Sequence, residues 1–368
     1  MKPTRLTLYH LSMPLLRPFE TSFGRITTRD CLLIEMQAGE LTGWGECPAD
    51  RDPGYSYETM GTAWHVTRDF LAPATLGREI AGPEDLQRRI SQVRGHPMAK
   101  AGLEMAWWDW RGKAEGRSLV NMLGGARERV EVGVSVGLQE SPAVLVRTVQ
   151  GYLEDGYTRV KIKIKPGRDV GDAGAVRAAF PDLRLQVDAN SAYTLEDAAA
   201  LLPLDELGLL LIEQPLAEDD LWDHSRLQAR LRTPLCLDES ILSARHARQA
   251  LEMGACRVIN IKAGRVGGLS EALAIHDLCV EHDVPVWCGG MLETGVGRAA
   301  NLALAALPNF TLPGDISATD RYYAEDITDE RFTLNPDSTI NVPGGPGLGV
   351  SLEPAALERA TMAKLSIP

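Results

Sequence analysis

The sequence is poor in histidine, in aromatic residues and in positive charge. Among its 368 residues are 7 histidines and 6% aromatic residues, and 38 Lys and Arg stand against 50 Asp and Glu, which gives a formal net charge of −12. A surface of this sign repels nucleic-acid phosphates and anionic lipids. We therefore expect no nucleic-acid or membrane partner, and an anionic substrate requires positive charge inside its own site.

Cysteine pairs and long apolar runs are also absent. The six cysteines are scattered, with no CxxC motif, which argues against a disulfide framework and against a thiolate zinc site. No run approaches the ~20 apolar residues of a transmembrane helix. Residues 1–6 lack the apolar core of a signal peptide. These absences favour a cytoplasmic protein.

The chain has an ordinary globular composition, 44% hydrophobic and 24% charged, arranged in two successive patterns. In residues 1–125, alternating apolar and polar segments predict antiparallel strands, and stretches with helical periodicity follow. The strand segments are 7–11, 31–36 and 41–46, and the helical ones are 58–71, 83–93 and 98–114. Strands followed by helices predict an α+β capping domain over residues 1–125.

From residue 126 to 320 short apolar runs alternate with helical stretches. The runs lie at 130–137, 159–164, 183–190, 207–215, 233–240, 256–262 and 283–290, with a weaker eighth at 310–315. Such a repeat predicts an α/β fold, a (β/α)7β-type TIM-like barrel, rather than an open sheet. Residues 321–368 contain no further βα unit, and we expect this C-terminal segment to pack back on the capping domain.

Ionisable residues stand at the predicted C-terminal strand ends, where barrel enzymes build their sites. Three carboxylates, Asp188, Glu213 and Asp238, are spaced 25 residues apart, one βα unit each. Side by side they would repel one another, and a hard divalent cation would relieve that repulsion. An all-oxygen set suits Mg²⁺, with Mn²⁺ or another divalent cation as alternatives. Zinc fits poorly, because no histidine lies at these ends.

Two lysines complement the carboxylates. Lys163 ends the second predicted barrel strand and Lys262 ends the sixth, so in a closed ring they face each other across the cavity. A lysine beside a bound cation has a lowered pKa and can act as a base. Each residue alone has a simpler interpretation, such as an exposed strand or a helix cap. Charges at five successive strand ends together favour an active site.

The motifs that hold these residues resemble the enolase superfamily and, within it, the muconate-lactonizing-enzyme subgroup. They are K-x-K (Lys161, Lys163), D-A-N (188–190), E-Q-P (213–215), D-E-S (238–240), the lysine of INIK (Lys262) and GGMLETG (289–295). The resemblance covers nearly the whole chain. It implies that Lys163 and Lys262 are the catalytic bases and that Asp188, Glu213 and Asp238 bind Mg²⁺. A mandelate-racemase-like histidine after the seventh strand is absent.

Further segments, FETSFG (19–24) among them, resemble o-succinylbenzoate synthases and N-acylamino acid racemases, as does Arg265. This implies Mg²⁺-dependent removal of the proton α to a carboxylate, giving an enediolate that the metal stabilises. The products would be racemised N-acyl (N-succinyl) amino acids, o-succinylbenzoate by syn dehydration, or both. Muconate cycloisomerases share the lysine pair and stay an alternative. Dipeptide epimerases require a D-x-D near the eighth strand, whereas here Asp315 is followed only by Asp320.

The remaining candidates are substrate-binding or supporting residues, placed by position alone. They are Lys161, Ser135, Asn190, Glu239, Arg265, Gly289, Met291 and Leu292 at the barrel mouth, and Phe19, Phe23 and Tyr55 in capping-domain loops. For the three aromatic residues, packing between cap and barrel is an equal alternative. Two rival functions stay open, a Schiff-base aldolase-type lyase at Lys262 and a non-catalytic barrel. We expect a small-molecule carboxylate substrate and a homo-oligomer.

Overall fold

The computed structural model describes residues 1–368 and begins with an antiparallel sheet. Its strands are β1 (Arg5–Glu20), β2 (Arg25–Ala38), β3 (Leu41–Cys47) and, at the far edge beside β1, β13 (Thr361–Ile367), in the order β13-β1-β2-β3. Helices α1 (Met60–Val66), α2 (Ala72–Thr75), α3 (Pro83–Ile90), α4 (Pro97–Glu115) and α5 (Leu119–Leu123) follow, with a π-helical turn at Thr67–Leu71. The predicted α+β unit is present.

Two glycines let α4 lie directly against β3. A Cβ atom on Gly43 would stand 2.0 Å from the carbonyl oxygen of Ala106, and one on Gly45 would stand 2.1 Å from that of Gly102. Any side chain there would push the helix off the sheet. This close contact fixes β3, and with it Glu46, which reaches into the barrel domain.

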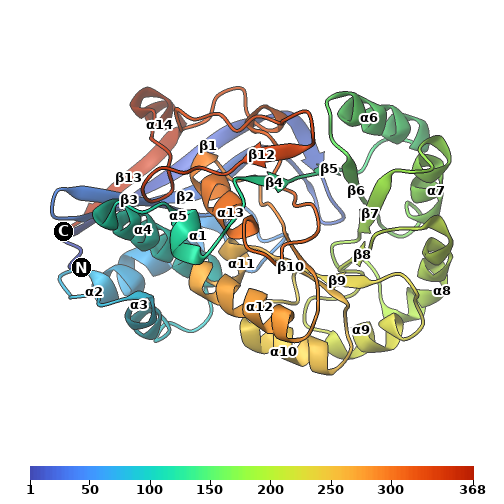
Figure 1. The fold of residues 1–368 in the computed structure, drawn as a ribbon, viewed down its shortest axis with the longest axis horizontal. Coiled ribbons are helices and arrows are strands. Elements are labelled where there is room, and N and C mark those ends of the chain that lie inside the picture. Colours follow the sequence, from blue (N-terminus) through green and yellow to red (C-terminus); the bar gives the residue numbers. More distant parts are fainter.

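The second domain is a curled parallel sheet of seven strands with helices outside it, as predicted (Figure 1). The strands are β5 (Val134–Val136), β6 (Arg159–Lys163), β7 (Arg184–Asp188), β8 (Ile212–Glu213), β9 (Leu235–Leu237), β10 (Val258–Ile261) and β11 (Val286–Cys288). The helices are α6 (Pro142–Glu154), α7 (Val170–Ala179), α8 (Ala198–Leu201), α9 (Leu221–Gln228), α10 (Ala244–Glu252), α11 (Ala263–Val266), α12 (Leu269–Glu281) and α13 (Gly295–Ala305). Near-complete burial of the strands matches their apolar runs.

The structure differs from the predicted strands at two places. The run 130–137 divides into β4 (Arg129–Glu131), which pairs with β12 (Thr339–Asn341), and β5, which pairs with β6. Residues 310–315 form no regular strand, because Pro313 cannot donate a ladder hydrogen bond. Isolated bridges from Phe310 to Val286 and from Gly314 to Val132 nevertheless place this segment between the two edges of the sheet.

The C-terminal residues contact both domains. Strand β12 lies on β4 at the barrel, and after α14 (Pro354–Ala360) strand β13 runs antiparallel along β1 from Leu6↔Ile367 to Leu11↔Thr361. All six cysteines are buried and free. No helix combines the length and apolarity that crossing a membrane requires.

Candidate active site

A cavity of about 370 Å³ lies between loops of the capping domain and the C-terminal ends of the barrel strands. Its size suits a small organic ligand. Most of the predicted residues line it, namely Phe19, Phe23, Tyr55, Ser135, Lys161, Lys163, Asn190, Lys262, Met291 and Leu292. The three carboxylates, Glu239, Arg265 and Gly289 lie behind this wall and contact its residues. Arg29, Glu58 and Tyr322, which sequence reasoning did not select, line it too.

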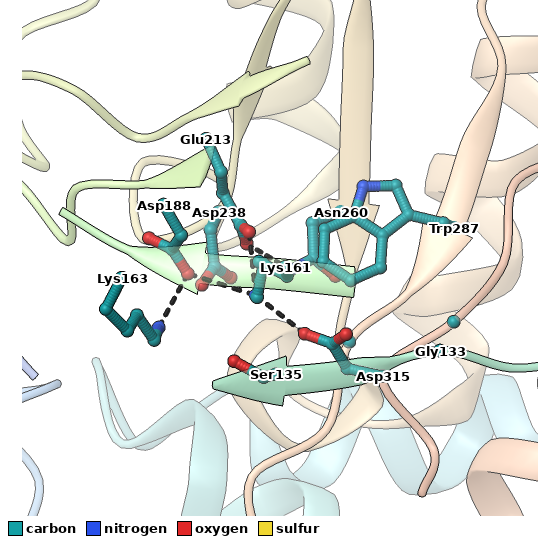
Figure 2. Close-up of polar contacts among 12 residues, drawn as sticks. Gly133, Ser135, Lys161, Lys163, Asp188, Glu213, Asp238, Asn260, Trp287 and Asp315 are labelled. Carbon is teal, nitrogen blue, oxygen red and sulfur yellow. Dashed lines mark hydrogen bonds and ion pairs between the residues drawn. The ribbon is translucent and has the colours of Figure 1, made fainter. Parts of the chain in front are cut away.

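The predicted carboxylates stand side by side. Asp188 and Glu213 end the neighbouring strands β7 and β8 and are register partners, and Asp238 directly follows β9. All three are almost completely buried, and Figure 2 shows them gathered around Lys161. Burial, and then the nearby Asp188 charge, raises the pKa of Glu213 to about 8. Additional positive charge beside Glu213 would therefore favour its ionised form.

The Lys163 half of the site is built from barrel residues. The Lys163 ammonium donates to Asp188 Oδ2 at 2.6 Å and to Asn190 Oδ1 at 2.7 Å. The Asn190 amide in turn donates to Glu239 Oε1 at 2.8 Å. Asn190 has a φ of 43°, a left-handed conformation that Asn tolerates better than most residues. From the capping domain, the Phe19 ring centre lies 6.0 Å from Lys163 Nζ.

The Lys262 half includes a hydroxyl from the capping domain. Lys262 Nζ donates to Asp238 Oδ2 at 2.8 Å and to the Tyr55 hydroxyl at 3.1 Å, and that hydroxyl donates to Asp238 Oδ1 at 2.9 Å. Arg265 also binds Asp238 and donates to the Asn260 carbonyl oxygen at 2.6 Å. Arg265 therefore supports a carboxylate and lies outside the cavity wall.

The pKa of Lys262 moves opposite to the direction expected from the sequence. Burial lowers it, but the adjacent Asp238 carboxylate, Tyr55 and Glu213 together outweigh burial and raise the pKa above its usual value. The sequence-based prediction of a lowered pKa assumed a bound cation, which would offset the negative charge of Asp238. Gly289 gives the lysine its space, since a Cβ atom there would stand 2.5 Å from Lys262 Cε.

The residues fit a hard divalent cation in chemistry. As the side chains stand, no three Asp, Glu, His or Cys residues converge on one point suited to a metal, because the carboxylate oxygens face lysine and arginine nitrogens. The donors are nevertheless buried oxygens, and Glu239 Oε2 is buried without any partner. An all-oxygen set of this kind matches Mg²⁺. Asp188, Glu213 and Asp238 would hold the ion.

Three buried residues of the strand-end network, Asp315, Arg159 and Asn260, were not among the predicted site residues. Asp315 lies 2.6 Å from Lys161 Nζ and 2.5 Å from Arg159 Nη1. Asn260 donates to Glu213 Oε1 at 2.7 Å. The sequence does carry a signal for each of them. Asp315 ends the run 310–315, and Arg159 and Asn260 are polar residues in the otherwise apolar runs 159–164 and 256–262.

A capped barrel with acids and lysines at its strand ends defines a known class. Residues 4–124 match the "Mandelate racemase / muconate lactonizing enzyme, N-terminal domain" family, and residues 144–356 match the "Enolase C-terminal domain-like" family. The chain therefore belongs to the enolase superfamily, and the prediction of an enzyme from this superfamily is confirmed.

Particular relatives lie close in sequence. The chain is 52% identical to an o-succinylbenzoate synthase of Geobacillus stearothermophilus, over 96% of this chain and 94% of that one. It is 50% identical to an N-succinylamino acid racemase of an Amycolatopsis species, over the whole of both chains. The crystal structure of an enolase-superfamily member from Listeria innocua superposes with a TM-score of 0.96 at 44% identity, covering 100% of this chain and 99% of that one.

Proposed function

We propose that the protein removes the proton α to a carboxylate, racemises N-succinylamino acids and forms o-succinylbenzoate by dehydration. The observation that carries this proposal is a pair of lysines that line one cavity: Lys163 ends β6 and Lys262 directly follows β10, four strands away in the sheet. Each ammonium is held by its own carboxylate, Lys163 by Asp188 and Lys262 by Asp238. Two bases facing one carbon are what inversion at that carbon requires.

In this proposal the two lysines exchange roles with the direction of the reaction. One lysine, in its neutral form, takes the α-proton from its face, and the other, as an ammonium, delivers a proton to the opposite face. A divalent cation bound by Asp188, Glu213 and Asp238 would supply positive charge against the substrate carboxylate. In dehydration one lysine serves as base and then as acid, while the other stays cationic.

Relatives with both names, synthase and racemase, are about equally similar to this chain, which supports the two activities in one site. A dipeptide epimerase function is less well supported, although an L-Ala-D/L-Glu epimerase of Bacillus subtilis is 30% identical. Both Asp315 oxygens are engaged by Lys161 and Arg159, and Asp320 is exposed. No free carboxylate pair waits there for a substrate ammonium.

The test follows N-succinyl-L-phenylglycine in D₂O with Mg²⁺, with NMR for loss of the α-proton and polarimetry for loss of rotation. We expect both signals to decay with the wild type and to persist after EDTA. Lys163→Ala and Lys262→Ala should each lower the rate of racemisation by roughly 10³-fold or more. In each variant the remaining lysine should still exchange the α-proton of one enantiomer with solvent. Lys165→Ala, two residues beyond Lys163, is the matched control and should behave as wild type.

Absence of exchange over hours would refute the racemase assignment and direct the test to muconate-type substrates. Activity that survives EDTA but is trapped by borohydride on Lys262 would support a Schiff-base lyase instead. Production of o-succinylbenzoate, followed by the appearance of aromatic absorbance, tests the second activity with the same variants.

A further inference from the structure

Lys161 is shared among three carboxylates. Its ammonium nitrogen lies 2.7 Å from Glu213 Oε2, 3.0 Å from Asp188 Oδ2 and 2.6 Å from Asp315 Oδ2. Figure 2 shows it between the cluster of β7 and β8 carboxylates on one side and Asp315 on the other. Under the proposed function two of these partners are metal ligands, so a bound cation and the Lys161 ammonium compete for the same oxygens.

Asp315 is held more firmly than an ordinary ion-pair partner. Arg159 donates to its Oδ1 at 2.5 Å and also to the carbonyl oxygens of Pro313 and Gly314. The Asp315 amide donates to the Cys288 carbonyl oxygen at 2.9 Å, which fastens the segment to β11. One carboxylate thus joins Arg159 and Lys161, two residues apart on β6, to the segment that closes the barrel.

The Trp287 ring completes this anchor. Its centre lies 4.9 Å from Lys161 Nζ and 5.6 Å from Arg159 Cζ, and its indole nitrogen donates to Cys236 Sγ at 3.2 Å. The ring is fully buried. Because the Trp287 ring and the Asp315 carboxylate both attract cations, they hold the Lys161 ammonium in place independently of Asp188 and Glu213.

We infer that Asp315 is a positioning residue: it holds the Lys161 ammonium on the β11 side, so that a divalent cation can take over the Asp188 and Glu213 oxygens that this ammonium also contacts. This inference rests on the proposed metal site. Without the Asp315 charge, Lys161 has only the two metal-ligand carboxylates as ionic partners and competes directly with the cation. Residues that orient ligands from behind in this way typically change metal affinity about 10- to 100-fold when replaced.

The experiment titrates metal-free protein with Mn²⁺ and follows free Mn²⁺ by electron paramagnetic resonance. The proteins are wild type, Asp315→Asn, Lys161→Met and the double variant. Asp109→Asn is the matched control, because Asp109 is a buried aspartate paired with Lys113 at 2.7 Å in the capping domain. We expect Asp315→Asn to raise the Mn²⁺ Kd about tenfold or more and the control to leave it unchanged.

The double-mutant cycle separates positioning from simple loss of negative charge. Lys161→Met removes the competing ammonium and should bind Mn²⁺ at least as tightly as wild type. Adding Asp315→Asn to Lys161→Met should raise the Mn²⁺ Kd by less than about threefold. A folded Asp315→Asn with wild-type affinity, or an equal loss in both backgrounds, overturns the inference.

The Lys161→Met arm keeps the test decisive if Asp315→Asn fails to fold. Weaker Mn²⁺ binding by Lys161→Met than by wild type contradicts competition between the ammonium and the metal. A wild type that binds no Mn²⁺ would instead refute the proposed metal site itself, so the two failures are distinguishable.

Discussion

The two halves of the active site are built differently around equivalent lysines. Lys163 draws its own hydrogen-bond partners, Asp188 and Asn190, from the barrel alone. The capping domain adds the Phe19 ring and, one residue removed from the lysine, the Ser22 hydroxyl, which donates to the Asn190 carbonyl oxygen at 3.1 Å. Lys262 shares Asp238 with a capping-domain hydroxyl, that of Tyr55. The cap therefore hydrogen-bonds directly to Lys262 but reaches the polar surroundings of Lys163 only through the Asn190 backbone, so changes in the cap should affect the two halves unequally.

Among changes that keep both lysines, the largest effect should come from filling the space beside Lys262. In Gly289→Ala the new methyl carbon would meet Asn260 Oδ1 at 2.4 Å and Lys262 Cε at 2.5 Å, which forces the lysine to move. We expect racemisation to fall about 100-fold, as a misplacement of about 1 Å typically costs, while Lys163 still exchanges the α-proton on its own face.

Measuring exchange and inversion separately in D₂O checks this prediction. Gly174→Ala, on α7 where a Cβ atom meets nothing within 4 Å, is the control and should leave both rates unchanged. Equal loss of exchange from both enantiomers in Gly289→Ala would show that the two halves are not independent.

Tyr55→Phe should give the next largest effect. It removes the hydroxyl that donates to Asp238 and accepts from Lys262, but keeps the ring, whose centre lies 4.4 Å from Lys262 Nζ. Loss of one buried hydrogen-bond pair predicts about a tenfold decrease in the rate of α-proton exchange with solvent, confined to the enantiomer that Lys262 deprotonates. Rates of α-proton exchange in D₂O, measured from each enantiomer separately, test this, and a uniform decrease would contradict it.

Asn190→Gly is the mirror change on the Lys163 half and should have a smaller effect. Glycine accepts the backbone φ of 43° without strain, while Lys163 keeps its contact with Asp188. We expect about a fivefold decrease in the rate of α-proton exchange from the opposite enantiomer, the one that Lys163 deprotonates. If Tyr55→Phe and Asn190→Gly slow the same enantiomer, the division into two halves is wrong.

We expect Glu46→Gln to have the smallest effect on catalysis but a clear effect on stability. Glu46 connects the capping domain to the loop after β11. Its carboxylate accepts from the Thr294 amide and hydroxyl and from the Gly297 amide. Burial, followed by the charge of Glu293, raises its pKa to about 7. The folded state therefore binds the Glu46 proton more tightly than the unfolded state does. As pH rises from about 4.5 to 7, the contribution of Glu46 to the free energy of unfolding should fall by about 3 kcal/mol.

Denaturant unfolding at several pH values tests the prediction. The difference in free energy of unfolding between wild type and Glu46→Gln should change with pH between about 4.5 and 7 and stay constant above pH 7. The exposed control Glu84→Gln should give a difference that does not change with pH. A flat difference for Glu46→Gln as well would show that folding does not change the pKa of this carboxylate.

The sequence predicts those parts of the site that recur with the βα repeat. The spacing of Asp188, Glu213 and Asp238 follows from the repeat length, so the repeat alone is enough to infer that they are neighbours. The contact between Tyr55 and Asp238 spans 183 residues, and no local pattern encodes it. Asp315 was missed as an anchor because the irregular segment before it, which contains Pro313, carries no strand periodicity.

The pairing of β13 with β1 has a consequence for synthesis of the chain. Strand β1 leaves the ribosome first, yet its partner at residues 361–367 is made only after the whole barrel. Until then β1 presents an open edge, the kind of surface that pairs with foreign strands. Such a long-range closure is also a slow step. Yield of native protein should therefore depend on chaperone capacity and growth temperature, with misassembly arising at this edge while the chemistry-bearing strands fold normally.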